Sequence, residues 1–128
     1  MIIGGAQIAS LNKASMLHFE DRMHSYLARF FSEAVARIDA AGLRSAIRQG
    51  VTRAEAYGIK SEKDVARYIV LSFFLGLESA RGVPHSWVSE LLQDHAITPK
   101  ARLKSIYDRI SAIRRSEGLA ARAPGIGP

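Results

Sequence analysis

Residues 68 to 77 form an apolar stretch that reads Tyr-Ile-Val-Leu-Ser-Phe-Phe-Leu-Gly-Leu. As a helix it would be apolar around nearly its whole circumference, and such a helix must be covered by other elements. Its ten residues are about half of the ~20 that cross a bilayer, and Arg67 and Glu78 bracket it. We therefore expect a buried core helix and no membrane partner.

The rest of the chain repeats apolar residues at three- and four-residue spacing, and no segment alternates with the period of two that a half-buried strand needs. The expected helices cover residues 16–38 with a break near Ser32, residues 43–57, a segment starting at the Ser61 and Asp64 capping signal, residues 87–92, and a segment from Thr98 onward. Gly50, inside the second helix, is expected to permit close approach of a neighbouring helix.

These patterns predict an all-α single domain, a bundle of five or six helices around a central apolar helix at about residues 61–77. A length of 128 residues fits one domain. We expect a flexible N-terminus at residues 1–9, a helical domain at residues 10–117 and a disordered tail at residues 118–128. The tail prediction rests on its prolines, its glycines and its lack of periodicity.

The sequence gathers no reactive side chains at a catalytic or metal-binding spacing. It contains no cysteine, which excludes disulfides, thiolate metal sites and cysteine nucleophiles. His18 and His24 are out of register on a helix, and His85 and His95 stand alone. The adjacent carboxylates of Glu20 and Asp21 point in different directions, and we expect them on a solvated face. We therefore expect no enzyme, no catalytic or metal-binding residue and no cofactor.

Positive charge is concentrated at the C-terminal end of the chain. The chain has 18 Lys and Arg against 12 Asp and Glu, and residues 100–128 contribute seven basic and two acidic side chains to that balance. Such a run is either a solvated helix face or a surface that attracts nucleic acid, an anionic membrane or an acidic protein. The residues expected to bind a partner are Lys100, Arg102, Lys104 and Arg109.

Two further expectations concern nucleic acid and location. Nucleic acid is not the expected partner, because the helix after Tyr57-Gly58-Ile59 becomes apolar all round and offers no groove-reading face. The last helix could still contact phosphates. Residues 1–10 lack the basic start and continuous apolar run of a secretory leader, so a cytoplasmic location is expected.

Several segments together resemble a family of small helical bacterial accessory proteins. They are Phe19-Glu20 with Leu27 and Phe30-Phe31, Ile47-Arg48-Gln49-Gly50, Tyr57-Gly58-Ile59, Ser61-Glu62-Lys63-Asp64-Val65 with Arg67-Tyr68-Ile69, and Trp87 with Leu91-Leu92. The resemblance covers residues 15–115. Two positions depart from the family pattern: Ser32 replaces an expected proline, and Val70 replaces a frequent acidic residue.

Members of this family are encoded among type VI secretion genes, near PAAR spike-tip proteins, effectors and their chaperones. The resemblance implies a context and a class of partner, and it supplies no catalytic motif. It suggests a non-enzymatic, co-chaperone-like adaptor that binds a secretion effector, its chaperone or the PAAR protein. An immunity protein that masks a toxin domain, or a small basic nucleic-acid-binding protein, are the alternatives. A homo-oligomer also stays open, because a second subunit could cover the apolar stretch.

Overall fold

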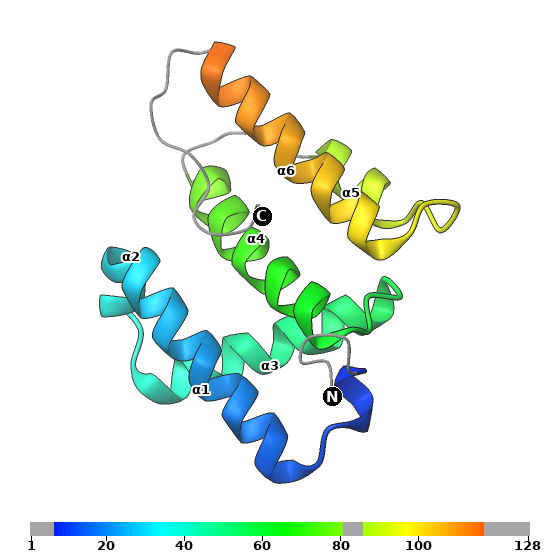
Figure 1. Ribbon diagram of the computed structural model, residues 1–128. Helices are drawn as coiled ribbons and strands as arrows, with labels where there is room; N and C mark the ends of the chain where they lie inside the picture. Colours follow the sequence, from blue (N-terminus) through cyan, green and yellow to red (C-terminus); the bar gives the residue numbers. More distant parts are fainter. Residues whose placement is uncertain (1–6, 81–85, 117–128) are drawn as a thin grey trace.

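Six α-helices and one short 3-10 helix make up the residues that the computed structural model describes, which are 7–80 and 86–116 (Figure 1). In chain order they are η1 (Ile8–Ser10), α1 (Lys13–Phe30), α2 (Ser32–Ala36), α3 (Ala40–Ala56), α4 (Glu62–Ala80), α5 (Ser86–Leu92) and α6 (Pro99–Ser116). These residues contain no strand, which confirms the prediction of an all-α single domain. The expected disordered tail at residues 118–128 lies outside the described residues.

Side-chain caps explain where several helices begin. The Ser61 Oγ accepts a hydrogen bond of 3.1 Å from the Asp64 amide, which confirms the capping signal ahead of α4. The Thr98 Oγ1 caps α6 in the same way, at 3.3 Å from the Ala101 amide. Helix α3 starts three residues before the expected Leu43, because the carboxylate of Asp39 caps it through the Gly42 amide.

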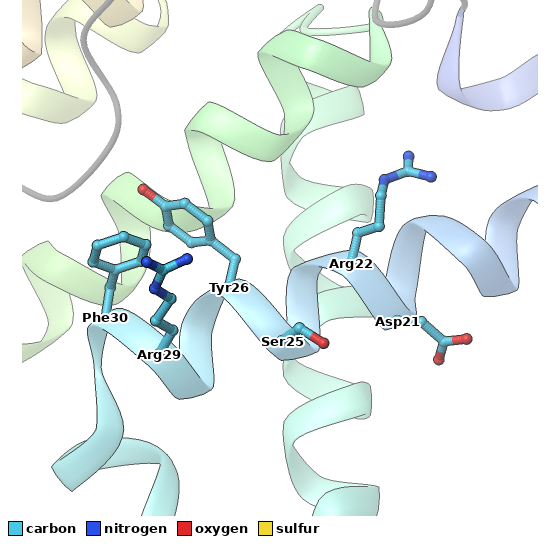
Figure 2. Close-up of a pocket in the computed structure, with 6 residues that line it drawn as sticks. All are labelled: Asp21, Arg22, Ser25, Tyr26, Arg29 and Phe30. Atoms are coloured by element: carbon cyan, nitrogen blue, oxygen red, sulfur yellow. The ribbon is translucent and has the colours of Figure 1, made fainter.

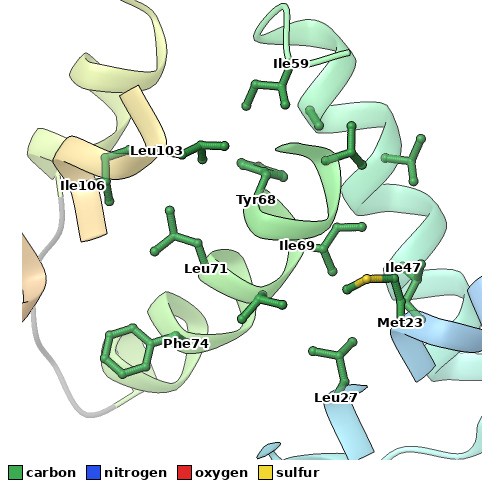
Figure 3. Packing of buried hydrophobic residues seen from close by; sticks show 14 of the residues in the cluster. Met23, Leu27, Ile47, Ile59, Tyr68, Ile69, Leu71, Phe74, Leu103 and Ile106 are labelled. Carbon is green, nitrogen blue, oxygen red and sulfur yellow. The ribbon is translucent and has the colours of Figure 1, made fainter. Parts of the chain in front are cut away.

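Helix α4 lies between the other helices, with α1 and α3 on one side and α6 on the other (Figure 1). Ile69 is fully buried and faces Met23, Leu27 and Ile47, whereas Leu71 points towards the side of α6 (Figure 3). Burying both faces of one helix removes a large apolar area from water. The prediction of a central apolar helix is confirmed.

Helices α3 and α4 approach closely at Gly50. A Cβ atom placed on Gly50 would lie 2.8 Å from the Cγ1 of Ile69, which is too near for any side chain. The backbone of α3 therefore packs directly against Ile69, as the sequence predicted from the helical glycine.

The turn between α3 and α4 also holds the start of the described chain. Gly58 adopts a φ of +77°, which ends α3 in a conformation that favours glycine. The Ile8 amide donates a hydrogen bond of 2.6 Å to the Lys60 carbonyl, and the Ile8 side chain is buried. Residues 1–6 lie outside the description, so the flexible segment expected at residues 1–9 stays a prediction.

In the described ranges, none of the helices combines the length and the apolar character that crossing a membrane requires.

Candidate interaction surface

Arg102 is buried, although the sequence predicted that it would lie on the surface and bind a partner. It is only 2% exposed. Its Nε donates to the Ile97 carbonyl at 2.9 Å, and its Nη1 donates to the carbonyls of Tyr57 at 2.8 Å and Leu92 at 2.6 Å. The side chain therefore closes the α5–α6 loop onto the α3–α4 turn, and the expectation of an exposed Arg102 is wrong.

The position of Arg102 explains how a buried cation is tolerated there. Tyr57 is the C-terminal cap of α3, and Leu92 is the last residue of α5. The carbonyls at a helix C-terminus carry partial negative charge and lack helical donors, so a guanidinium compensates both deficits.

The other three predicted basic residues are exposed, and two of them already contact other side chains of the chain. Lys104 pairs with Asp108 one turn on, at 2.7 Å. The guanidinium of Arg109 lies 4.4 Å from the centre of the Trp87 ring. Lys100 has no ion pair among the described residues. Partner binding by this set stays a prediction, without Arg102.

The histidines do not come together in the part of the chain that the structure describes. His18 is exposed, and the His95 ring lies beside Gly58. Within these residues, no three His, Asp or Glu side chains form a group that could hold a metal ion. His85 lies outside the described residues.

Glu20 is buried rather than solvated, which corrects the sequence interpretation. Its side chain is 3% exposed and accepts hydrogen bonds from Arg48 at 2.9 Å and from Arg44 at 3.0 Å. Arg44 also pairs with Asp21 at 2.6 Å. The hydrogen bond from Arg48 is the main cause that lowers the pKa of Glu20, burial opposes it, and Arg44 lowers it further. These ion pairs join α1 to α3.

Among the described residues, a shallow hollow of about 570 Å³ runs along α1, and sequence reasoning did not find it. We call it the α1 hollow. Two rows of residues line it, and successive residues within a row are one helical turn apart. One row contains Arg22, Tyr26 and Phe30, and the other contains Asp21, Ser25 and Arg29 (Figure 2). Ser25, a small residue, lies at the middle of the second row.

Two aromatic rings and one arginine meet at one end of the α1 hollow. The rings of Tyr26 and Phe30 lie 4.5 Å apart, centre to centre, and the guanidinium of Arg29 lies 5.4 Å from the Phe30 ring centre. Phe30 is 44% exposed, although it is a large apolar side chain. The Tyr26 hydroxyl is buried without a hydrogen-bond partner, whereas its ring borders the hollow.

The two arginines of the α1 hollow have different partners. Arg22 pairs with Glu62 of α4 at 2.7 Å, and its side chain is still 57% exposed. Arg29 makes no ion pair with any described residue, so its charge faces solvent beside the rings. The hollow therefore offers an apolar contact and a cation in the same place.

The sequence carried a signal for this surface. Phe30 falls on the apolar stripe of the first helix, but the helix ends there, and the last residue of a stripe has no following turn to cover it. A second hollow of about 320 Å³ on α3 is lined only by polar side chains, namely Ser45, Arg48, Gln49, Thr52 and Arg53. It lacks the apolar contact of the α1 hollow.

Comparison with known proteins gives no relative: no family model, no curated protein and no solved structure matches the chain.

Proposed function

We propose that the chain is a non-enzymatic adaptor that binds a type VI secretion effector, its chaperone or a PAAR spike-tip protein. The partner class comes from the resemblance of the sequence to small helical accessory proteins. The binding role is supported by the molecule itself, because one end of the α1 hollow brings together Tyr26, Arg29 and Phe30. Tyr, Phe and Arg are enriched at the centres of protein interfaces.

The observation that carries the proposal is the exposure of Phe30. Phe30 is 44% exposed, and its ring contacts the tilted Tyr26 ring and the Arg29 guanidinium. Apolar area is buried when a partner covers it. Leu17, near the start of α1, and Ile38, after α2, are also exposed, at 40% and 38%. Phe30 is the one aromatic side chain among the exposed large apolar residues of the described chain, and it lies beside a cation, which makes it a candidate anchor.

The residues that carry the family resemblance mainly support the fold. Gly58 forms the α3–α4 turn, Ser61 caps α4, and Val65 and Ile69 are fully buried. Phe30 also belongs to the segments that carry the resemblance, but its side chain is exposed, and we propose that it contacts the partner.

Affinity capture from the native host tests the proposal. Wild-type protein and a Phe30→Ala/Arg29→Glu variant serve as baits, and mass spectrometry identifies the captured proteins. An Arg53→Glu variant is the charge control, because Arg53 is exposed on α3, away from the α1 hollow. Circular dichroism establishes that all three baits are folded.

We expect the wild-type and Arg53→Glu baits to capture an effector, a loading chaperone or a PAAR protein, and the α1 variant to lose it. A toxin captured alone would overturn the adaptor role in favour of an immunity protein. Ribosomal or chromosomal material lost at high salt would overturn it in favour of nucleic-acid binding.

A further inference from the structure

We infer that the α1 hollow docks an amphipathic helix that presents an apolar side chain with a carboxylate about one turn away on each side. This inference rests on the proposed adaptor function and specifies the chemistry of the segment that is recognised. It follows from the spacing of the lining residues, from their charge and from the small residue at the centre.

The spacing of the lining residues fits a helix. Arg22, Ser25, Tyr26 and Arg29 occupy positions i, i+3, i+4 and i+7 of α1. Four residues at these positions frame the hole that receives one side chain of a facing helix. Ser25 is the smallest of the four, so an apolar side chain of the partner can approach the backbone of α1 there. Tyr26 and Phe30 then contact the next apolar residue of the same partner helix.

The charge of the hollow selects acidic neighbours for that apolar side chain. Arg22 and Arg29 stand at the two ends of the frame, seven residues apart, which is about 10.5 Å along the axis. Arg29 meets no carboxylate of the described chain, and the Arg22 side chain is 57% exposed although it pairs with Glu62. Asp21 does not cancel this charge, because Arg44 holds it at 2.6 Å. Partner carboxylates seven residues apart therefore match both arginines.

The same charges argue against a second copy of this chain as the occupant. Two antiparallel α1 helices related by a two-fold axis near Ser25 would place Arg22 of one copy opposite Arg29 of the other. That contact would occur twice, and like charges across a helix pair are destabilising. An acidic helix removes this repulsion and supplies ion pairs at both ends.

Synthetic peptides test the inference with the full-length protein. The probe is a labelled, alanine-rich helical peptide of about 20 residues that repeats Glu-x-x-Leu-x-x-x-Glu. Its twin carries Lys in place of each Glu, and binding is measured by fluorescence anisotropy. Wild-type protein is compared with Phe30→Ala, Arg29→Glu and the Arg53→Glu control.

We expect the Glu peptide to bind and the Lys peptide not to bind. Arg29→Glu is expected to lower the affinity for the Glu peptide by about tenfold or more and to raise the affinity for the Lys peptide. Phe30→Ala weakens the Glu peptide, whereas Arg53→Glu changes its affinity by less than about twofold. Equal losses in Arg29→Glu and Arg53→Glu would overturn the inference, because they would indicate unspecific charge attraction.

Two further outcomes separate this inference from the proposed function. Dimerisation that Phe30→Ala abolishes, seen by sedimentation, would make a second copy the occupant and overturn the acidic-helix inference. Capture of a secretion partner with unchanged yield by the Phe30→Ala/Arg29→Glu bait would also overturn it, whereas the adaptor role itself would then remain through another surface. Peptide binding without any secretion partner would support the docking chemistry and count against the adaptor role.

Discussion

Arg102 holds three carbonyls with one guanidinium, and no described carboxylate pairs with it. Removing the guanidinium leaves buried acceptors without donors, at a cost of about 1–3 kcal/mol for each acceptor that water does not reach. We expect Arg102→Met to lower the free energy of unfolding by about 2–4 kcal/mol, measured by urea denaturation. Lys104→Met, at an exposed position of the same helix, is expected to change it by less than about 1 kcal/mol. Equal effects would contradict the structural role of Arg102.

The buried Glu20 makes stability depend on pH. Its pKa is lowered in the folded state, chiefly by the hydrogen bond from Arg48. The ionised form therefore stabilises the fold above the ordinary glutamate pKa of about 4.3, and this contribution is lost as the pH falls through the lower folded value. We expect Arg48→Met to be less stable than the wild type at neutral pH. Its stability should also fall less on acidification. Arg53→Met should keep the wild-type profile in thermal melts between neutral and acid pH.

Removing the Tyr26 hydroxyl should not lower the free energy of unfolding, in contrast to replacing Arg102 or Arg48. It is buried and has no hydrogen-bond partner, a state that is unfavourable by about 1–3 kcal/mol. Tyr26→Phe removes the hydroxyl and keeps the ring, so the free energy of unfolding should stay unchanged or rise by about 1 kcal/mol. A clear decrease in the urea midpoint would show that the hydroxyl is bonded in solution.

At the scale of the helices, Gly50→Ala and Gly76→Ala should change the stability of the fold in opposite directions. Gly50→Ala places a Cβ 2.8 Å from the Ile69 Cγ1, in a fully buried contact. Overpacking of about 1–3 kcal/mol then exceeds the gain of about 1 kcal/mol in helix propensity. Gly76 has no atom within 4 Å of such a Cβ, so Gly76→Ala should raise stability by up to about 1 kcal/mol. Thermal melts of both variants check this. The double variant Gly50→Ala/Ile69→Ala, which relieves the contact, is measured in the same way.

The helices could be predicted from the sequence because their causes are local. Apolar spacing gave α3 and α4, and the Ser61 hydroxyl gave the start of α4. The buried charges have distant causes. The partners of Glu20 lie 24 and 28 residues further along the chain, and one carbonyl bound by Arg102 lies 45 residues away.

A partial signal for these buried charges was present in the sequence. Arg102 lies four and eight residues before Ile106 and Ile110, in the same helical row, and Glu20 lies three residues before Met23. A charged residue in an apolar row of a helix is expected to be buried, but this can be concluded only once its partners are known. The α1 hollow was missed because Phe30 belongs to an apolar stripe, and only the end of α1 exposes it.

At the scale of the whole molecule, α4 joins two groups of helices, α1–α3 and α5–α6, which pack on opposite sides of it. Opening of either side exposes residues of α4, whereas α2 contributes no buried side chain. We expect hydrogen exchange, followed by mass spectrometry, to be slowest for amides around Ile69 and to be fast in α2. Comparable protection of α2 and the middle of α4 would contradict this organisation.

The single tryptophan of the chain lies in the α5–α6 group, where the guanidinium of Arg109 covers its ring. Its emission is thus an intrinsic optical reporter for the half of the molecule that lies across α4 from Phe30. An unlabelled ligand titrated onto α1 would leave that signal constant if recognition stays local, and would change its intensity or wavelength if the far helices respond.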